Sequence, residues 1–234
     1  MRANKYRPID PRWPHGEERL HKLLAKAGFG SRRACEELLT DGERITVNGE
    51  PIRTLGAKAN PATQDIRVDG ERISLPERTV YMINKPQGYL CTNHDECGRA
   101  DKLAIRLVPP PSTGRLFPVG RLDQDSEGLL LITNDGELAQ QLTHPSFRVP
   151  KTYRVWIRGS LSVEAHRRLL EGVWISEGRA RPESIKIKKR LRKSTQLEVV
   201  LREGKNREIR RIFAQVGYPV SKLIRISIGF LHLG

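Results

Sequence analysis

Two octets of the sequence alternate apolar residues around a turn-forming dipeptide, and they constrain the fold more than any other feature. Residues 45–52 read Ile-Thr-Val-Asn-Gly-Glu-Pro-Ile, and residues 66–73 read Ile-Arg-Val-Asp-Gly-Glu-Arg-Ile. Asn-Gly and Asp-Gly tolerate the positive φ angles of a two-residue turn, so they are the strongest short-range signal for a pair of antiparallel strands. Each octet therefore predicts a β-hairpin.

The stretch before these octets predicts two short amphipathic helices. Apolar residues recur at i, i+3, i+4 and i+7 in the first helix, at Leu20, Leu23, Leu24 and Ala27. Gly28 and Gly30 end this helix, and Ser31 is placed to cap the N-terminus of the next. The second helix turns Cys35, Leu38 and Leu39 inward and ends at Gly42. Two helices followed by two hairpins predict a compact unit, which we assign to residues 17–75.

This stretch resembles a known RNA-binding module. The run Arg-Leu-His-Lys-Leu-Leu-Ala-Lys-Ala-Gly-Phe-Gly-Ser-Arg-Arg that begins at Arg19, together with Val-Asn-Gly at residues 47–49, is similar to the small domain first known from a ribosomal small-subunit protein. In such domains the helix pair lies against RNA. Basic residues fall on the non-core side of both helices, where they could meet phosphates: Lys22, Lys26, Arg32 and Arg33. A solvated helix face would give the same pattern.

The charge of the chain indicates a polyanionic partner. The formal net charge is +15, from 42 Lys and Arg against 27 Asp and Glu. Each phosphate that a basic side chain neutralises releases condensed counterions, so nucleic acid fits this excess better than an anionic membrane or a solvated surface. Residues 1–16 are basic and carry three prolines, which predicts a flexible arm.

Several other classes of protein are disfavoured. Cys35, Cys91 and Cys97 are odd in number and match no zinc-ligand spacing, so neither a disulfide framework nor a structural metal is expected. No apolar run approaches the ~20 residues that cross a bilayer, and the N-terminus lacks the apolar core of a secretory signal. We therefore expect a cytoplasmic protein with no membrane contact.

After a linker at residues 74–79 the sequence predicts a second, larger domain over residues 79–234. Strand-like runs occur at residues 80–84, 129–133, 153–157, 185–187, 197–201 and 223–228. Helical patterns occur at residues 137–142, 163–170 and 207–216. Because strands outnumber helices and do not alternate with them, the pattern favours an α+β domain with a mostly antiparallel sheet over a doubly wound one.

The segment that carries the chemistry is a polar loop at residues 119–128. Gly120 and Gly128 allow tight turns on either side of Asp123, and the apolar residues 129–132 anchor the loop to a core. A carboxylate on an anchored loop suits covalent or acid–base catalysis. By spacing alone, a turn or capping residue would look the same.

This loop resembles the catalytic motif of the pseudouridine synthases that modify ribosomal RNA. The matching residues are Gly120-Arg121-Leu122-Asp123, Asp125-Ser126 and Gly128-Leu129-Leu130. Agreeing segments are Asn-Lys-Pro-Gln-Gly at residues 84–88, Lys-Thr-Tyr at 151–153, and Glu-Gly-Lys-Asn-Arg-Glu-Ile-Arg-Arg-Ile at 203–212. The chain most resembles the branch that joins this domain to the RNA-binding module, and the likeness runs from about residue 18 onward. Members of this branch are expected to continue beyond the last strand, whereas this chain ends at Gly234.

The resemblance implies roles for individual residues. Asp123 matches the essential carboxylate, which either attacks C1′ of the target nucleotide or takes part in forming a glycal. Tyr153 matches the aromatic residue that packs on uracil and serves in proton transfer at C5, and Arg210 matches the basic partner of the catalytic Asp. Gly120, Arg121 and Leu122 shape the loop. From the residues alone, Tyr153 could be a core residue, and Arg210 could be a phosphate contact.

The implied reaction breaks the N1–C1′ bond, turns the uracil and joins C5 to C1′. No electrons or groups enter from outside, so we expect neither cofactor nor metal. The target must leave its stack to reach the pocket. A basic run spans residues 179–193, beside the proposed site. Candidate RNA contacts in this domain are Lys186, Lys188, Lys189, Arg190, Lys205 and Arg207.

Two alternatives remain open. A glycosidase-type hydrolase also uses a carboxylate at C1′, but it needs a second carboxyl group in a defined role. A non-catalytic ribosome-assembly factor would use both domains only to bind RNA. We favour modification of large-subunit ribosomal RNA by a monomer, while the sequence leaves the target uridine open.

Overall fold

The computed structural model describes residues 16–92, 100–111 and 114–234. Almost all of the predicted basic arm, and Cys97, lie outside these residues. The chain divides into two compact units, an N-terminal unit built mainly from residues before Val80 and a C-terminal unit built mainly from Val80 onward. No helix in the described ranges is long and apolar enough to cross a bilayer.

The N-terminal unit confirms the two predicted helices and the two hairpins. Its helices are α1 (Leu20–Ala27) and α2 (Arg32–Thr40). Its four-stranded sheet has the order β3-β2-β5-β6, with β2 Ile45–Val47, β3 Glu50–Pro51, β5 Ile66–Val68 and β6 Glu71–Arg72. The short strands β1 (Glu18–Arg19) and β4 (Lys58–Ala59) form a separate pair. Asn48 and Asp69 take φ angles of 54° and 50°, as the predicted turns require.

The helix ends follow from local chemistry. The Ser31 hydroxyl oxygen accepts a hydrogen bond from the Ala34 amide at 3.1 Å, which satisfies a donor that the first turn of α2 leaves free. Gly28 ends α1 at a φ of 101°, in the left-handed region. The apolar face of both helices packs onto the hairpins. The buried core residues are Leu20, Leu23, Leu24, Cys35, Leu39, Ile45, Val47, Ala59, Ile66, Val68 and Ile73.

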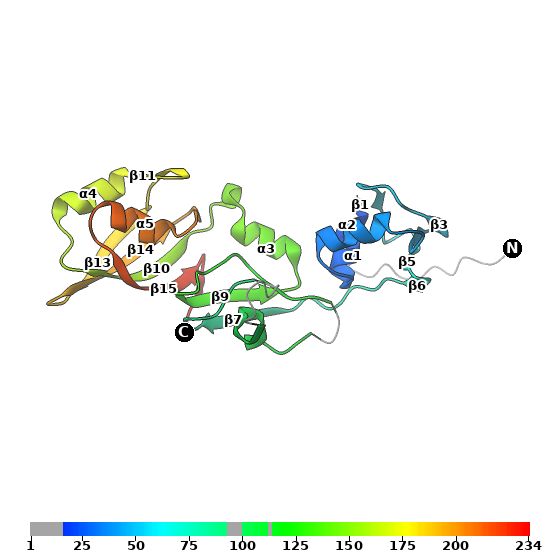
Figure 1. The fold of residues 1–234 in the computed structure, drawn as a ribbon, viewed down its shortest axis with the longest axis horizontal. Coiled ribbons are helices and arrows are strands. Elements are labelled where there is room, and N and C mark those ends of the chain that lie inside the picture. Colours follow the sequence, from blue (N-terminus) through cyan, green and yellow to red (C-terminus); the bar gives the residue numbers. More distant parts are fainter. Residues whose placement is uncertain (1–15, 93–99, 112–113) are drawn as a thin grey trace. The chain divides into compact units, whose positions relative to one another are not determined.

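The C-terminal unit is built on an eight-stranded sheet (Figure 1). Its main path runs β13-β14-β10-β15-β9-β7, with β16 beside β15 and β8 beside β9. The strands are β7 Val80–Lys85, β8 Phe117–Pro118, β9 Glu127–Thr133, β10 Lys151–Arg158, β13 Ser184–Arg190, β14 Ser194–Leu201, β15 Val220–Ile228 and β16 Leu231–His232. Every pairing is antiparallel except that of β9 with β15. The expectation of a mostly antiparallel sheet is therefore confirmed.

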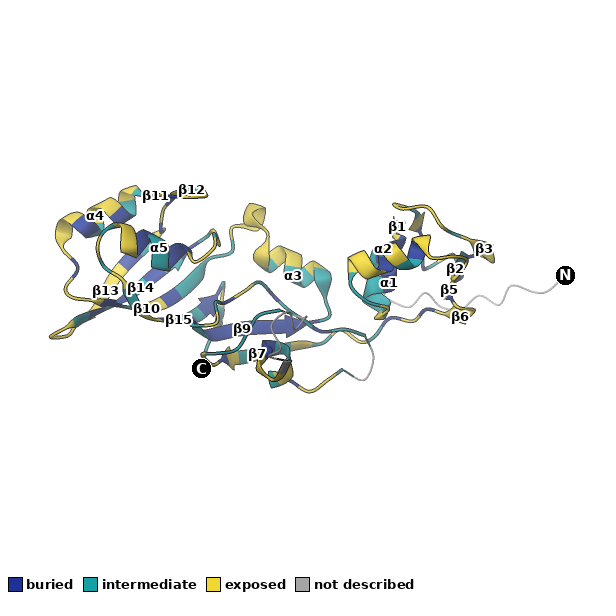
Figure 2. Ribbon diagram, in the orientation of Figure 1, coloured by how far each residue is buried: buried dark blue, intermediate teal, exposed yellow. Residues whose placement is uncertain are grey.

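Helices pack against this sheet. Its α-helices within the described residues are α3 (Gly136–Thr143), α4 (Val163–Glu171) and α5 (Glu208–Gln215), and short 3₁₀ turns lie at Ala100–Lys102, Ala104–Leu107 and Pro145–Phe147. The main core cluster joins α4 and α5 to the inward side chains of β10 and β14. In Figure 2 the ribbon is dark blue at the buried residues of these strands. Tyr153, Val155 and Ile157 point into this core, whereas Arg154 and Arg158 of the same strand are exposed.

Two features of this unit were not predicted. A separate hairpin, β11 (Val173–Ile175) with β12 (Gly178–Ala180), lies between α4 and β13. Its strands are only three residues long, too short for a periodicity to stand out. The second feature is the parallel contact between β9 and β15, where Gly128 lies opposite Arg225. A Cβ on Gly128 would lie 2.3 Å from the backbone oxygen of Arg225, so only glycine fits there.

Replacing Gly128 with alanine is expected to break this contact. The substitution would strain a φ of 110° and drive a methyl group into backbone atoms that have no room to move. Gly178→Ala is the matched control, because Gly178 has a φ of 100° and nothing within 4 Å of an added Cβ. We expect the control to lose about 1–2 kcal/mol of unfolding free energy, and Gly128→Ala to lose about 3 kcal/mol more. Urea unfolding measures both, and equal losses would contradict the role assigned to the close approach.

Candidate active site

The loop that carries Asp123 lies between β8 and β9 and is tied down at both ends. Before it, the Val119 amide donates to the Leu131 carbonyl oxygen at 2.8 Å. Within it, the Ser126 amide donates to the Asp123 carbonyl oxygen at 3.0 Å and closes a tight turn. The Leu122 side chain is buried in the main core. These contacts leave the Asp123 side chain 27% exposed, so its carboxylate is held in place and still accessible.

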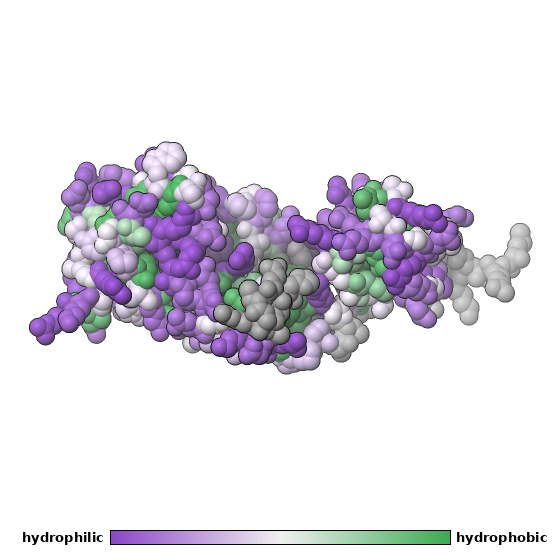
Figure 3. All heavy atoms as spheres, viewed as in Figure 1, coloured by the Kyte–Doolittle hydropathy of each residue, from purple (hydrophilic) through white to green (hydrophobic). Residues whose placement is uncertain are grey.

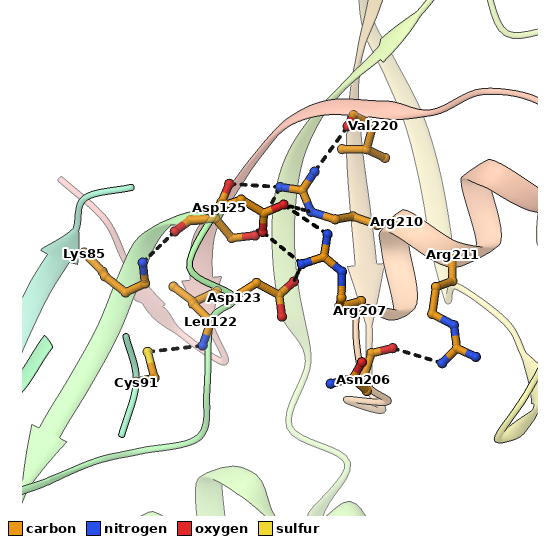
Figure 4. A network of polar contacts seen from close by, with 11 residues as sticks. Lys85, Cys91, Leu122, Asp123, Asp125, Asn206, Arg207, Arg210, Arg211 and Val220 are labelled. Atoms are coloured by element: carbon orange, nitrogen blue, oxygen red, sulfur yellow. Dashed lines mark hydrogen bonds and ion pairs between the residues drawn. The ribbon is translucent and has the colours of Figure 1, made fainter. Parts of the chain in front are cut away.

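A buried lysine holds this turn by donating hydrogen bonds to backbone carbonyl oxygens. Lys85, at the end of β7, is fully buried, and its Nζ donates to the carbonyl oxygens of Ser126 at 2.8 Å and of Pro86 at 2.9 Å. Burial lowers the pKa of Lys85, and the negative charges of Asp123 and Asp125 oppose that shift. On the adjoining segment the Cys91 Sγ accepts the Leu122 amide at 3.4 Å (Figure 4). Hydrogen bonds therefore hold the backbone on both sides of Asp123.

Arg207 connects the loop to α5. It precedes the helix and has a φ of 47°, a left-handed conformation that is uncommon outside glycine. Its guanidinium donates to both carboxylate oxygens of Asp125, at 3.1 and 3.0 Å, and lies 3.5 Å from Asp123 Oδ2 (Figure 4). Arg211 donates to the carbonyl oxygen of the neighbouring Asn206 at 3.3 Å. Strained residues held by their surroundings are common at functional sites.

Arg210 contacts a different carboxylate from the one that the resemblance implied. It donates to the Asp125 and Val220 carbonyl oxygens at 2.9 and 3.2 Å, and its Nε lies 3.4 Å from Asp125 Oδ2. Asp123 instead forms an ion pair with Arg207, a residue that the sequence assigns to RNA contact. Spacing along a helix could not reveal this exchange, because it depends on the left-handed turn at Arg207. A catalytic role for Arg210 stays a prediction.

The two arginines set the charge state of Asp125. Burial would raise the pKa of this carboxyl, but the hydrogen bond from Arg207 and the nearby charge of Arg210 outweigh it and lower the pKa. In turn, the hydrogen bond that Arg207 donates to Asp125 raises the pKa of Arg207. Asp125 therefore stays ionised and holds both guanidinium groups at the loop that carries Asp123.

Tyr153 packs in the core cluster that anchors the Asp123 loop. It is 8% exposed and shares this cluster with Leu122, which precedes Asp123, and with Ile209 of α5. Three of the four sequence segments that carry the resemblance to the synthases therefore meet in one cluster. Tyr153 also stands opposite Arg225 of β15 and Val199 of β14.

The predicted RNA contacts of this unit fall on both faces of the sheet. Lys186 stands in register with Glu198, which pairs with Arg154, so these three side chains lie on the face opposite Tyr153. Lys188 lies 3.7 Å from the Glu198 carboxylate, and Lys189 is exposed on the same strand. By contrast, Arg190 donates to the Leu161 carbonyl oxygen before α4, and Lys205 donates to the Arg179 carbonyl oxygen of β12. Figure 3 shows a largely hydrophilic surface over α4 and β13.

The predicted RNA contacts of the N-terminal unit are less uniform than expected. Arg32 and Arg33 are exposed at the start of α2. Lys22 is half-buried on α1, and Lys26 pairs with Glu18 at 2.9 Å. The two arginines are therefore more accessible to phosphate than the two lysines.

The sequence matches two family models that cover both units. The model described as RNA pseudouridylate synthase matches residues 79–215, more than half of the chain, and the S4 domain model matches residues 18–65. The chain belongs to the RNA pseudouridylate synthase family and carries an N-terminal S4 domain, an RNA-binding module. It is thus an enzyme that isomerises uridine in RNA.

Relatives match over nearly the whole chain. An uncharacterized RNA pseudouridine synthase of Mycobacterium bovis is 42% identical over 230 residues, which cover 97% of this chain and 89% of the relative. Ribosomal large subunit pseudouridine synthase B of Bacillus subtilis is 36% identical over 218 residues, covering 92% and 87%. A crystal structure of a pseudouridylate synthase aligns with a TM-score of 0.61 at 26% identity, covering 92% of this chain and 90% of the other. The sequence-based expectations of family and fold are confirmed.

Arg207→Lys is expected to slow pseudouridine formation about 10- to 100-fold, because an ammonium cannot keep the two-oxygen contact with Asp125 and the approach to Asp123 together. Arg202→Lys is the matched control, since Arg202 holds Glu183 through two nitrogens at 2.7 and 2.8 Å away from this loop. Exposed ion pairs add little stability, so both variants should melt within a few degrees of wild type. The rates of the two variants are compared directly, and equal rates would refute the role given to Arg207.

Proposed function

We propose that this protein isomerises one uridine of large-subunit ribosomal RNA, with Asp123 as its catalytic carboxylate. Relatives from Bacillus subtilis and Vibrio cholerae, at 36% and 38% identity, bear the name ribosomal large subunit pseudouridine synthase B. A formal net charge of +15 fits a polyanion as large as ribosomal RNA. The observation that carries the proposal is the accessible Asp123 carboxylate, ion-paired with Arg207 on a loop anchored at both ends.

Asp123 acts at C1′ of a nucleotide that has left its stack. The carboxylate attacks C1′, or takes part in forming a glycal, as the N1–C1′ bond breaks. Arg207 orients Asp123, because its guanidinium lies 3.5 Å from the carboxylate. Arg210 acts one step further back, through its contacts with Asp125.

Tyr153 holds the freed uracil while it turns. An aromatic ring offers a stacking surface without fixing one in-plane orientation, which a rotating base requires. Gly120, Arg121 and Leu122 shape the backbone that presents Asp123. We assign this chemistry to a catalytic domain over residues 79–234.

The S4 domain, which we assign to residues 17–75, binds the RNA that surrounds the target. Arg32 and Arg33 are the accessible cations at the start of α2, where the helix dipole adds to their attraction for phosphate. In the C-terminal unit the assigned contacts are Lys186, Lys188, Lys189, Arg190 and Lys205. The monomeric state and the cytoplasmic location stay predictions.

The proposal is tested by release of tritium from ribosomal RNA labelled at uridine C5, since isomerisation must expel that hydrogen. Wild type should release it from large-subunit RNA, and Asp123→Asn should be slower by at least about 10³-fold. The substitution keeps the shape of the side chain, so RNA affinity should stay within a few-fold of wild type. Binding without release by either protein would favour an assembly factor, and release from small-subunit RNA alone would overturn the substrate assignment.

Replacing Arg32 and Arg33 with glutamine tests the S4 assignment separately. Each phosphate contact that is lost should lower the slope of log affinity against log salt by about 1, and kcat at saturating RNA should stay unchanged. Filter binding at several salt concentrations measures the slope. Arg67→Gln is the control, because Arg67 already pairs with Asp65 at 2.8 Å. An unchanged slope in the double variant would remove these residues from the RNA interface.

A further inference from the structure

A second guanidinium lies buried behind the catalytic loop. Arg225 of β15 is 2% exposed. Its Nε donates to the Leu129 carbonyl oxygen at 2.8 Å, and its Nη1 donates to the Arg121 carbonyl oxygen at 3.4 Å. Its Nη2 is also buried but has no hydrogen-bond partner among the described residues. Buried donors are nearly always paired, so this nitrogen indicates a group that the folded chain does not itself supply.

Lys151 places a second cation on the same face of the sheet. It lies two residues before Tyr153 in β10, and the two residues stand in unbroken register opposite Leu201 and Val199, both buried. Arg225 stands opposite Tyr153 from the other side. Side chains that alternate by two or face one another across a pair share a face. Lys151, Tyr153 and Arg225 therefore line one wall.

The two cations influence each other. Burial lowers the pKa of the half-buried Lys151, and the positive charge of Arg225 lowers it further. The Nζ of Lys151 donates a hydrogen bond to the Val149 carbonyl oxygen at 3.3 Å. Two like charges held close in a partly dry wall are unfavourable until an anion joins them.

Glu208 does not supply the anion that Lys151 and Arg225 require. Glu208, in the first turn of α5, is 3% exposed, and it opposes the pKa shift of Lys151 from a distance. One of its oxygens accepts the Lys205 amide at 3.1 Å, within the turn that precedes the helix. Burial raises the pKa of Glu208 itself, which disfavours its charged form. Within the described ranges no carboxylate forms an ion pair with Lys151 or Arg225.

We propose that Lys151 and the free Nη2 of Arg225 bind the uracil anion that leaves C1′ during isomerisation. This inference rests on the proposed function. When the N1–C1′ bond breaks heterolytically, its electron pair goes to the base, and the negative charge spreads over N1, O2 and O4. Two fixed cations beside Tyr153 stabilise that charge as it develops, while the ring packs on the tyrosine. The charge disappears when C5 joins C1′, because the electron pair of the anion forms that bond. C5 then releases its proton and N1 takes one up, which leaves the base neutral.

A base anion fits this wall better than an RNA phosphate. Arg225 is fully buried and lies directly across from Tyr153, the residue assigned to stack on uracil. It also holds the backbone of Arg121, two residues from the carboxylate that acts at C1′. A charge that exists only during the reaction also explains why the resting protein leaves Nη2 unpaired.

Lys151→Met tests the proposal, because it keeps the length of the side chain and removes its charge. Lys151→Arg retains the charge. Arg225 is not replaced, since it also holds two carbonyl oxygens of the loop and of β9. Lys222→Met is the matched control. Lys222 stands opposite Trp156 on the other face of the same strand pair and lies 3.3 Å from Glu127.

At saturating ribosomal RNA, Lys151→Met should lower the single-turnover rate of tritium release about 10²- to 10³-fold, as loss of one donor to a developing anion does. Lys151→Arg should recover to within about tenfold of wild type, and Lys222→Met should match wild type. RNA affinity and its salt slope should be unchanged in all three. An unchanged rate with Lys151→Met, in an active wild type, would overturn this inference alone.

Two other outcomes also count against it. A salt slope lowered by about 1 with an unchanged rate at saturation would assign Lys151 to a phosphate. A lower melting temperature that Lys151→Arg fails to restore would make the lysine structural. A wild type that releases no tritium would remove the proposed function together with this inference.

Discussion

The parallel contact between β9 and β15 is the constraint on which the rest of the site depends. At Gly128 the two backbones come too close for any side chain, and the Asp123 loop ends at this point. The same contact fixes Arg225 opposite Tyr153, because β15 lies between β9 and β10. The distance between the Asp123 loop and Tyr153 is thus set by backbone pairing, which tolerates less variation than side-chain packing does. A site built on sheet register can hold its geometry even though its loop is exposed.

Electrostatic contacts then distinguish the two carboxylates of the loop. The structure gives Asp123 and Asp125 different sets of contacts. Asp125 accepts two nitrogens of Arg207 and lies beside Arg210, whereas Asp123 keeps one longer ion pair and remains 27% exposed. If Asp123 were bound as tightly as Asp125, its oxygens would have to give up those hydrogen bonds before reaching a substrate carbon. Asp125 thus neutralises the arginines, which leaves the Asp123 carboxylate available for the role that we propose for it.

Much of this architecture could be predicted from local sequence. The hairpins of the S4 domain, the cap at Ser31 and the strand that follows Asp123 each depend on a few neighbouring residues, and the structure has them where the pattern put them. The partner of Asp123 could not be predicted this way. It depends on a left-handed residue before α5 and on a loop more than eighty residues earlier. The buried cation pair was missed for the same reason, because Lys151 and Arg225 meet only through strand order.

The buried cations Lys85 and Arg225 also differ in whether their donor nitrogens have hydrogen-bond acceptors, and we infer different roles from this difference. Lys85 and Arg225 are both buried, and each donates to one carbonyl oxygen of the Asp123 loop and to one outside it. The Lys85 ammonium has two acceptors, so a purely structural role accounts for its burial. Arg225 keeps one buried nitrogen that has no partner among the described residues, on a strand whose register sets it opposite Tyr153. A guanidinium suits both tasks at once, because its rigid fork can hold backbone with one edge and present the other edge to a charge that forms only during the reaction.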